Sequence, residues 1–277
     1  MPKLSSHLGQ MASEFKGFVA DRFSWSHLRH AVSHGVDVLL PPQGLDRASA
    51  EAMDFTPHEP VLQSGLSGDR WARIRFLDGE GCGMCARPLD GLYFGGQCHD
   101  CLDRPFPFRR ARAACLYGEA SRDLVLKFKH GDRTDLAPVL SRWIERAGAD
   151  LLAECDVIVP VPLHPSRLRA RRYNQAAELA RPVARRLNKT YLPDALIRTQ
   201  KTSPQGRDPD TRWANVRKAF AMTAAGAKRI DGRAVVLIDD VFTTGATLRA
   251  CAETLLKAGA RQVDCIVVAR AVKSDSL

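Results

Sequence analysis

Long apolar runs are absent from this chain of 277 residues. None of its hydrophobic stretches approaches the roughly 18 residues that a helix needs to cross a bilayer, so the sequence predicts no membrane insertion. Residues 1–20 contain no continuous apolar core followed by a small-residue cleavage site, which argues against a secretory leader. We therefore expect a cytoplasmic protein in which disulfides are not favoured.

The chain has fewer acidic residues than basic ones, 31 against 41, which gives a formal net charge of +10. The shortage is greatest between residues 161 and 190, where Glu178 stands against eight basic residues. Such a bias favours a polyanionic ligand, either a phosphorylated small molecule or nucleic acid, and composition does not choose between them. The alternative is that many of these side chains simply solvate helix faces.

Two common nucleotide-binding motifs are also missing. The chain's main strand–loop–helix motif has neither the Gly-Lys-Ser/Thr ending of a triphosphate loop nor the spaced glycines of a dinucleotide fingerprint. Instead, residues 235–238 form an apolar run that is typical of a buried parallel strand, and Asp239 and Asp240 follow it directly. After a loop over 241–246, apolar residues recur at helical spacing from Leu248 onward.

This loop has the chemistry of an anion site. A helix N-terminus offers unpaired amides and the positive end of the helix dipole. Gly245 lets the backbone approach a ligand closely, and the hydroxyls of Thr243, Thr244 and Thr247 can donate to phosphate oxygens. The two carboxylates suit vicinal hydroxyls or a divalent cation, so a ribose with a 5-phosphate fits both features. The alternative, a strand end followed by an ordinary turn, is disfavoured by the strand and helix on either side.

A second loop is predicted beside the first. Residues 156–161 (DVIVPV) predict the first core strand, and the prolines after it prevent its continuation. Ligands of open α/β sheets bind at the carboxyl ends of the strands, so the loops after both strands should meet. The second loop offers the polar side chains of Arg167, Arg169, Arg171, Arg172, Asn174 and Gln175. Arginines beside a phosphate cradle suit pyrophosphate, and Mg²⁺ is expected to arrive with it.

Four of the eight cysteines are clustered. Two Cys-x-x-Cys pairs, Cys82 with Cys85 and Cys98 with Cys101, are separated by twelve residues that suffice for a short hairpin through 92–94. This spacing predicts a structural Zn²⁺ site, because four sulfurs leave no open position for a substrate. The alternative is a redox dithiol. The other four cysteines lie singly, and we interpret them as small buried hydrophobes.

The rest of the chain gives weaker signals. Apolar patterning predicts helices over 134–149 and about 172–188, where Pro182 implies a kink or a helix start, and a buried strand over 263–269. Residues 103–114 look like a basic linker. The polar segment 198–220, which includes Arg212, is either a lid that closes over a charged substrate or a solvated connector.

In this order, these motifs resemble those of the ComF family. The resemblance covers about residues 60–270 and rests on the cysteine ribbon, LKFKHGDR at 126–133, PVPLHPSRLRARRYNQ at 160–175, the polar segment 198–220, and VVLIDDVFTTGATL at 235–248. The last motif is specific to phosphoribosyltransferases at large, and the combination is specific to ComF. Residues 39–75 depart from the family pattern, because they contain no cysteine where a first metal site would begin. We therefore expect one zinc.

The resemblance implies an α/β protein with the type I phosphoribosyltransferase fold, a parallel sheet flanked by helices with a hood, preceded by a small zinc-ribbon module with four cysteine ligands. We expect an N-terminal extension over 1–75, partly disordered or with a degenerate first ribbon, then the ribbon over 76–108 and the phosphoribosyltransferase-like domain over 109–273. The resemblance implies that Asp239 and Asp240 are catalytic and hold the ribose hydroxyls. The implied substrate-binding residues are Val241, Thr243, Thr244, Gly245, Ala246, Thr247, Arg167, Arg171, Asn174, Gln175 and Arg212.

The function that we expect is Mg²⁺-dependent transfer of ribose 5-phosphate from phosphoribosyl pyrophosphate to an unidentified nitrogen acceptor. One alternative is a non-catalytic module in competence, DNA uptake or single-stranded DNA handling, with competence-machinery proteins as partners and with Arg109, Arg110 and Arg112 as candidate DNA contacts. Another is a regulator that senses a nucleoside 5-phosphate without turnover.

Overall fold

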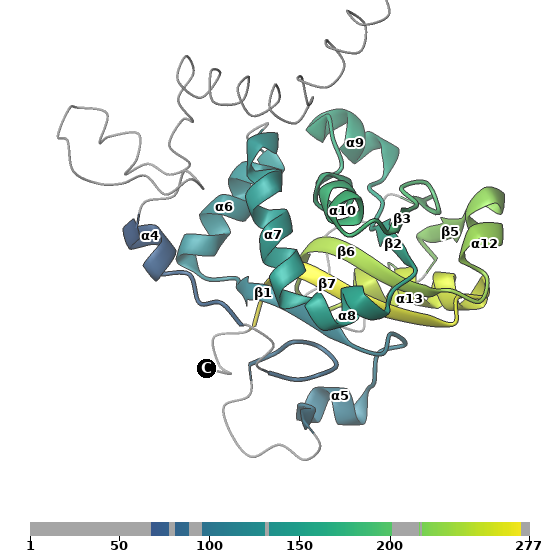
Figure 1. The fold of residues 1–277 in the computed structure, drawn as a ribbon, viewed down its shortest axis with the longest axis horizontal. Helices are drawn as coiled ribbons and strands as arrows, with labels where there is room; N and C mark the ends of the chain where they lie inside the picture. The colour runs from purple at the N-terminus through teal and green to yellow at the C-terminus, as the bar shows by residue number, and fades with distance from the viewer. Residues whose placement is uncertain are drawn as a thin grey trace, which may run out of the picture. The chain divides into compact units, whose positions relative to one another are not determined.

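The computed structural model describes residues 68–77, 81–88, 96–130, 133–200, 216 and 218–272. Its centre is a five-stranded sheet in the order β1-β7-β6-β2-β3, with every neighbouring pair parallel (Figure 1). The strands are β1 (Ala111–Leu116), β2 (Val157–Pro160), β3 (Thr190–Tyr191), β6 (Ala234–Phe242) and β7 (Gln262–Arg270). The predicted parallel α/β sheet is confirmed.

Helices pack on both faces of this sheet (Figure 1). Val235 and Leu237 of β6 share one buried cluster with Leu248 of helix α13. The alternate residues, Val236 and Ile238, point to the opposite face because side chains alternate along a strand, and there α7 and α10 contact the sheet. The helices are α4 (Gly68–Ala72), α5 (His99–Asp103), α6 (Glu119–His130), α7 (Ala137–Ala147), α8 (Ala149–Glu154), α9 (Pro165–Arg171), α10 (Gln175–Arg186), α12 (Ala224–Ile230) and α13 (Ala246–Lys257), with a 3₁₀ turn at Thr134–Leu136.

Helix α10 shows why a proline within a helical pattern is ambiguous. The helix begins at Gln175, and Pro182 lies inside it, so of the two alternatives predicted at Pro182, a kink or a helix start, the start does not occur. The start is fixed by Asn174, whose side chain accepts a hydrogen bond of 3.1 Å from the Ala176 amide. An N-cap of this kind stabilises a helix by about 1 kcal/mol.

Strand β1 was not predicted, because it lies in the segment that we interpreted as a basic linker. It is buried except at Arg112, which is half-buried, and its outer edge is covered by residues 75–77. The Leu77 amide donates to the Ala114 carbonyl at 3.0 Å, the Leu116 amide donates to the Arg75 carbonyl at 2.9 Å, and Phe76 forms an antiparallel bridge with Cys115. Residues at the expected boundary between the N-terminal extension and the ribbon therefore pack against the sheet domain.

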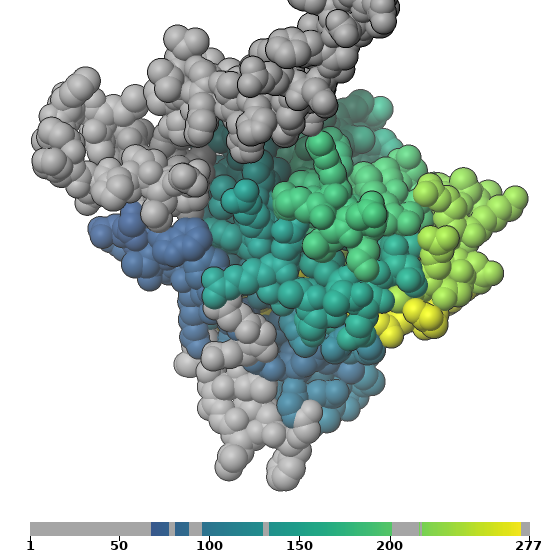
Figure 2. All heavy atoms as spheres, in the orientation of Figure 1, coloured from purple at the N-terminus to yellow at the C-terminus, as the bar shows by residue number. Residues whose placement is uncertain are grey.

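A small hood stands beside the main sheet. Strands β4 (Leu196–Arg198) and β5 (Phe220–Met222) pair antiparallel, and α12 follows them. In the space-filling view of Figure 2, the residues of β5 and α12, coloured light green, project beside the main sheet domain. Arg198 is buried at the end of β4, and its guanidinium lies over the Phe220 ring.

Candidate functional site

The two predicted carboxylates lie within β6. The strand continues through Asp239 and Asp240 to Phe242, because β7 continues beside it and pairs Val241 with Ala269. The predicted loop over 241–246 is therefore shorter, consisting of residues 243–245, and α13 begins at Ala246. Thr243 is exposed, and Thr244 and Thr247 are half-buried, so these hydroxyls lie at or near the surface.

Gly245 occupies the turn between the strand and the helix. It is the N-cap of α13 and has a φ of +80°, a conformation that disfavours other residues. A Cβ atom at this position would lie 2.6 Å from ring atoms of both Phe106 and Phe242. The turn therefore requires glycine for two independent reasons, and the first amides of α13 are left at the end of the turn as donors for an anion.

The two carboxylates have different surroundings. Asp240 is 9% exposed, and its Oδ1 lies 3.0 Å from the Lys129 Nζ, which comes from α6. The Asp239 Oδ1 accepts a hydrogen bond of 2.9 Å from the Asp240 amide. Burial, followed by the neighbouring negative charge of Asp240, raises the pKa of the Asp239 carboxyl to about 7. The ion pair with Lys129 was not predicted, although Lys129 lies in the LKFKHGDR segment.

We expect Asp239→Asn to stabilise the protein in a pH-dependent way. In the unfolded chain the carboxyl ionises near its ordinary pKa of 3.8, so the unfolded chain loses its proton first and folding stability falls as pH rises from about 4 to about 7. The variant should therefore be more stable than the wild type at pH 8, by up to about 4 kcal/mol at about 1.4 kcal/mol per pKa unit, and equal to it near pH 4. Chemical denaturation across this pH range measures the difference. The exposed Asp194, changed to Asn, is the control, and identical pH profiles for wild type and Asp239→Asn would refute the expectation.

The basic loop follows β2, which neighbours β6, as predicted. The side-chain amides there are engaged within the fold. The Asn174 Nδ2 donates to the Val161 carbonyl at 3.0 Å, and Gln175 is 2% exposed, with its Oε1 accepting from the Arg171 Nη1 at 3.2 Å. Arg167 lies half-buried in α9. The loop thus places arginines near the carboxyl ends of both strands, while Asn174 and Gln175 shape it.

Arg198, which belongs to the hood, interacts electrostatically with Arg167 and Asp239. Burial, and then the positive charge of Arg167, lowers the pKa of the Arg198 guanidinium. The negative charge of Asp239 raises this pKa. Arg198 therefore lies within electrostatic reach of both the basic loop and the carboxylates. Arg198 begins the predicted lid segment, where it is one of the side chains expected to close over a charged substrate. Arg212, a predicted binding residue in the same segment, lies outside the described residues.

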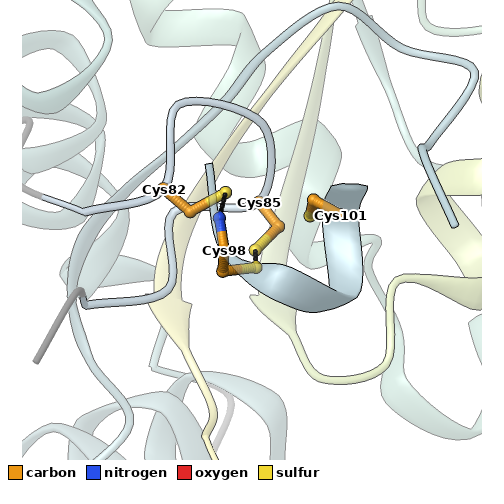
Figure 3. A group of neighbouring side chains, drawn as sticks. All are labelled: Cys82, Cys85, Cys98 and Cys101. Carbon is orange, nitrogen blue, oxygen red and sulfur yellow. Dashed lines mark hydrogen bonds between the residues drawn. The ribbon is translucent and has the colours of Figure 1, made fainter. Parts of the chain in front are cut away.

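The four clustered cysteines converge (Figure 3). Their sulfur atoms all lie within 4.8 Å of one another, and all four side chains are buried. The Cys85 and Cys98 sulfurs are 3.6 Å apart, and the Cys98 amide donates to the Cys82 sulfur at 3.3 Å. Sulfurs that surround one tetrahedral ion at about 2.3 Å would be roughly 3.8 Å apart, so this group could bind a metal ion. The predicted hairpin through 92–94 lies outside the described residues.

The arginines that we considered as DNA contacts take part in ion pairs. Arg109 holds the buried Asp264 with its Nε at 3.1 Å and its Nη2 at 2.7 Å. Arg110 and Arg112 approach the carboxylate of Asp150, in α8, at 3.3 and 2.9 Å. These contacts connect the start of β1 to β7 and α8. Charge reversal at these positions would therefore disturb the fold as well as any surface role.

One hollow lies away from these groups. It is lined by Cys155, Asp156, Asn188, Lys189, Thr190 and Arg233. Residues 155 and 156 precede β2, so the hollow lies at the amino ends of the strands. The carboxylates lie toward the opposite, carboxyl end of the sheet, and the hollow takes no part in the site.

Comparison with known proteins identifies the class of this domain. Residues 174–275 match the family model described as "Phosphoribosyl transferase domain". This range includes the carboxylates, the loop and α13. Together with the parallel sheet, the match defines a domain with the phosphoribosyltransferase fold.

Curated relatives identify the family. The DNA utilization protein YhgH of Escherichia coli (strain K12) is 30% identical over 191 residues, which are 66% of this chain and 80% of that protein. Competence protein F of Haemophilus influenzae is 30% identical over 196 residues, 69% of this chain and 84% of that protein. The chain belongs to the ComF family.

Solved structures are more distant. The glutamine phosphoribosylpyrophosphate amidotransferase from B. subtilis has a TM-score of 0.34 and 18% identity, and the match covers 52% of this chain and 30% of that chain. The present chain thus spans less than a third of that enzyme, and the likeness is too weak to carry an argument. Among the described residues, we find no helix with the length and apolarity to cross a membrane.

Proposed function

We propose that this protein is a cytoplasmic phosphoribosyltransferase that binds phosphoribosyl pyrophosphate with Mg²⁺ and transfers its ribose 5-phosphate to a nitrogen acceptor. The observation that carries the proposal is the placement of Asp239 and Asp240 one short turn before Gly245 at the start of α13. This arrangement sets two acceptors for a sugar diol beside a group of amide donors for a phosphate.

Each group has a role in this proposal. The amides of Gly245 to Thr247 and the nearby threonine hydroxyls bind the 5-phosphate, and Asp239 and Asp240 accept hydrogen bonds from the ribose hydroxyls. Lys129 orients the Asp240 carboxylate through their ion pair. In the reaction, the bond from C1 to the pyrophosphate oxygen breaks, the electron pair leaves with pyrophosphate, and a C1–N bond forms while the acceptor gives up a proton. Arg167 and Arg198 stabilise the charge of the leaving group.

Two metal ions belong to the proposal. The chemistry of the four buried sulfurs fits one structural Zn²⁺. For Mg²⁺, the carboxylate pair offers oxygen ligands, but Asp240 already has a cationic partner. The pair therefore fits an ion that enters bound to the pyrophosphate of the substrate better than an ion held in a protein cage. When bound, Mg²⁺ would neutralise pyrophosphate charge.

Calorimetry with phosphoribosyl pyrophosphate and Mg²⁺ tests the proposal. We expect saturable binding by the wild type and a rise of at least tenfold in Kd for Asp240→Asn, because a charge-assisted hydrogen bond contributes about 1.5–3 kcal/mol. The exposed Asp194→Asn should bind as the wild type does. Absence of heat with the wild type, or an unchanged Kd in Asp240→Asn, would refute the proposal. A screen of nitrogen bases for pyrophosphate release then identifies the acceptor.

A second candidate function is a non-catalytic role with single-stranded DNA or competence proteins. The names of the relatives, a DNA utilization protein and a competence protein, favour it. Exposed arginines such as Arg169 and Arg185 would contribute to it. Salt-sensitive DNA binding that persists in Asp240→Asn, together with no response to phosphoribosyl pyrophosphate, would favour this role. Binding of the sugar phosphate without pyrophosphate release would instead indicate a sensor.

A further inference from the structure

Arg270 is a buried cation at the end of β7. It is 5% exposed, and in the described part of the chain it donates to backbone carbonyls and forms no ion pair with a carboxylate. Its Nε donates to the Cys85 carbonyl at 2.8 Å, and its Nη1 donates to the carbonyls of Phe242 and Thr243 at 3.0 and 2.7 Å and to that of Ala271. The Arg270 guanidinium therefore links Cys85 of the metal centre to Thr243, the first residue of the loop over 243–245.

The aromatic ring of Phe242 strengthens this link. The Arg270 guanidinium carbon lies 4.3 Å from the centroid of that ring. A cation stacked on a desolvated ring is attracted by the negative face of the ring. Because Phe242 directly precedes the loop, Arg270 contacts the same short segment through both the ring and two carbonyls. A shift of the guanidinium would therefore move Phe242 and Thr243, where the loop begins.

Phe106 provides a second connection between the same two regions. Its amide lies 3.4 Å from the Met84 sulfur, which belongs to the first Cys-x-x-Cys pair. Its ring stacks on Phe108 at 4.7 Å and meets the edge of Phe242 at 5.6 Å. On the loop side, the same ring leaves no room for a side chain at Gly245. The cysteine module thus contacts the loop through both a polar and an apolar connection.

The stability of the connection through Arg270 should depend on whether the metal is bound. A buried cation without an anionic partner is costly, and its cost falls when negative charge is nearby. Arg270 contacts the metal centre directly, because its Nε donates to the Cys85 carbonyl at 2.8 Å. A divalent ion bound by four thiolates leaves a net charge of about −2 on the centre. A filled centre would therefore stabilise Arg270 in its observed position, and an empty one would not.

We propose that Arg270 is a positioning residue that couples occupancy of the four-cysteine metal centre to the geometry of the loop over 243–245. Filling the centre fixes the Cys85 carbonyl and supplies the counter-charge for Arg270, which then holds the start of the loop. The metal thereby determines how well the loop amides are arranged for an anion. The part of this proposal that concerns ligand affinity rests on the proposed function, whereas the coupling itself does not.

Hydrogen exchange in the full chain tests the coupling without any ligand. On removal of the metal with a chelator, the amides of residues 243–249 in the wild type should exchange at least tenfold faster, while those of α7 change little. Arg270→Met with metal bound should already show fast exchange in the loop, and chelation should add little, because both changes break the same link. Arg270→Lys, which keeps the charge but not the fork of donors, should be intermediate.

Controls separate coupling from general destabilisation. Leu140→Ala in α7 removes a buried side chain far along the chain from both regions and should leave the metal dependence of loop exchange intact. If Arg270→Met does not fold, Arg270→Lys provides the comparison, because it keeps the buried cation and loses the fork of donors. Equal loop exchange with and without metal in the wild type would overturn the proposal, as would a metal response of normal size in Arg270→Met.

Affinity measurements distinguish this proposal from the proposed function. If the wild type binds phosphoribosyl pyrophosphate, we expect about tenfold weaker binding after chelation and in Arg270→Met. Equal affinity with and without metal would overturn the part of this proposal that concerns ligand affinity and leave the proposed function intact. A loop that responds to the metal in a protein that does not bind the sugar phosphate would support the coupling and refute the proposed function.

Discussion

Gly245→Ala should raise the Kd for phosphoribosyl pyrophosphate by at least about 100-fold, which corresponds to about 2.7 kcal/mol. The new Cβ would lie 2.6 Å from ring atoms of Phe106 and Phe242, and the φ of +80° would strain any side chain. Since both rings are packed between the cysteine module and the sheet, the loop has to move instead. Its amides would then no longer converge on one phosphate. Calorimetry with Mg²⁺ present measures the loss.

Gly232→Ala is the matched control for this substitution. Gly232 also has a positive φ, of +67°, but a Cβ there would have no atom within 4 Å. The variant should therefore lose about 1 kcal/mol of stability through backbone strain and bind as the wild type does. If the two variants bound the sugar phosphate equally well, the loop around Gly245 would not be the phosphate site.

Loss of the metal centre should have the largest effect on stability. We expect one Zn²⁺ per chain, and we expect chelation or Cys101→Ser to lower the Tm by more than about 10 °C. Structural zinc contributes about 10–16 kcal/mol to the folding of small modules, and 1 kcal/mol shifts the Tm by about 2–4 °C in a domain of 150–250 residues. The effect should extend beyond the module, because its four cysteines belong to the same buried cluster as α13. Metal analysis and thermal unfolding measure both quantities.

A cysteine outside the centre provides the comparison. Cys155 is also buried, and its sulfur donates to the Leu152 carbonyl in a separate part of the fold. Cys155→Ala should keep the metal and lose only the stability of one small buried side chain. A protein that contains no zinc after purification, takes none up and melts at the same temperature with a chelator would contradict the expected structural role.

The features that could be predicted from the sequence are local ones. The strand, loop and helix from Val235 onward follow one another directly in the sequence. The spacing of their apolar residues predicts the strand and the helix, and a glycine at position 245 predicts a tight turn between them. The four cysteines form two Cys-x-x-Cys pairs, the spacing that two metal-binding turns require. These signals led to the correct fold class and to the correct family.

The features that were missed depend on contacts between distant segments. Lys129 reaches Asp240 across more than 100 residues of sequence, and Arg270 reaches Cys85 across a separation of 185. Strand β6 extends past the carboxylates because β7 continues beside it, which no pattern in β6 itself reveals. Phe106 looked like part of a linker, although its ring packs beneath the loop. Residue type alone does not indicate which distant partner a side chain will meet.

The antiparallel contact of residues 75–77 with β1 has a consequence for self-association. An uncovered edge strand is a template onto which another chain can add its own strand. Here the outer amides and carbonyls of β1 are already partly used by Arg75 and Leu77, and the other edge, β3, is only two residues long. Within the described residues, neither edge of the five-stranded sheet has a long row of unpaired backbone groups, so this sheet is a poor template for adding a strand from another copy of the protein.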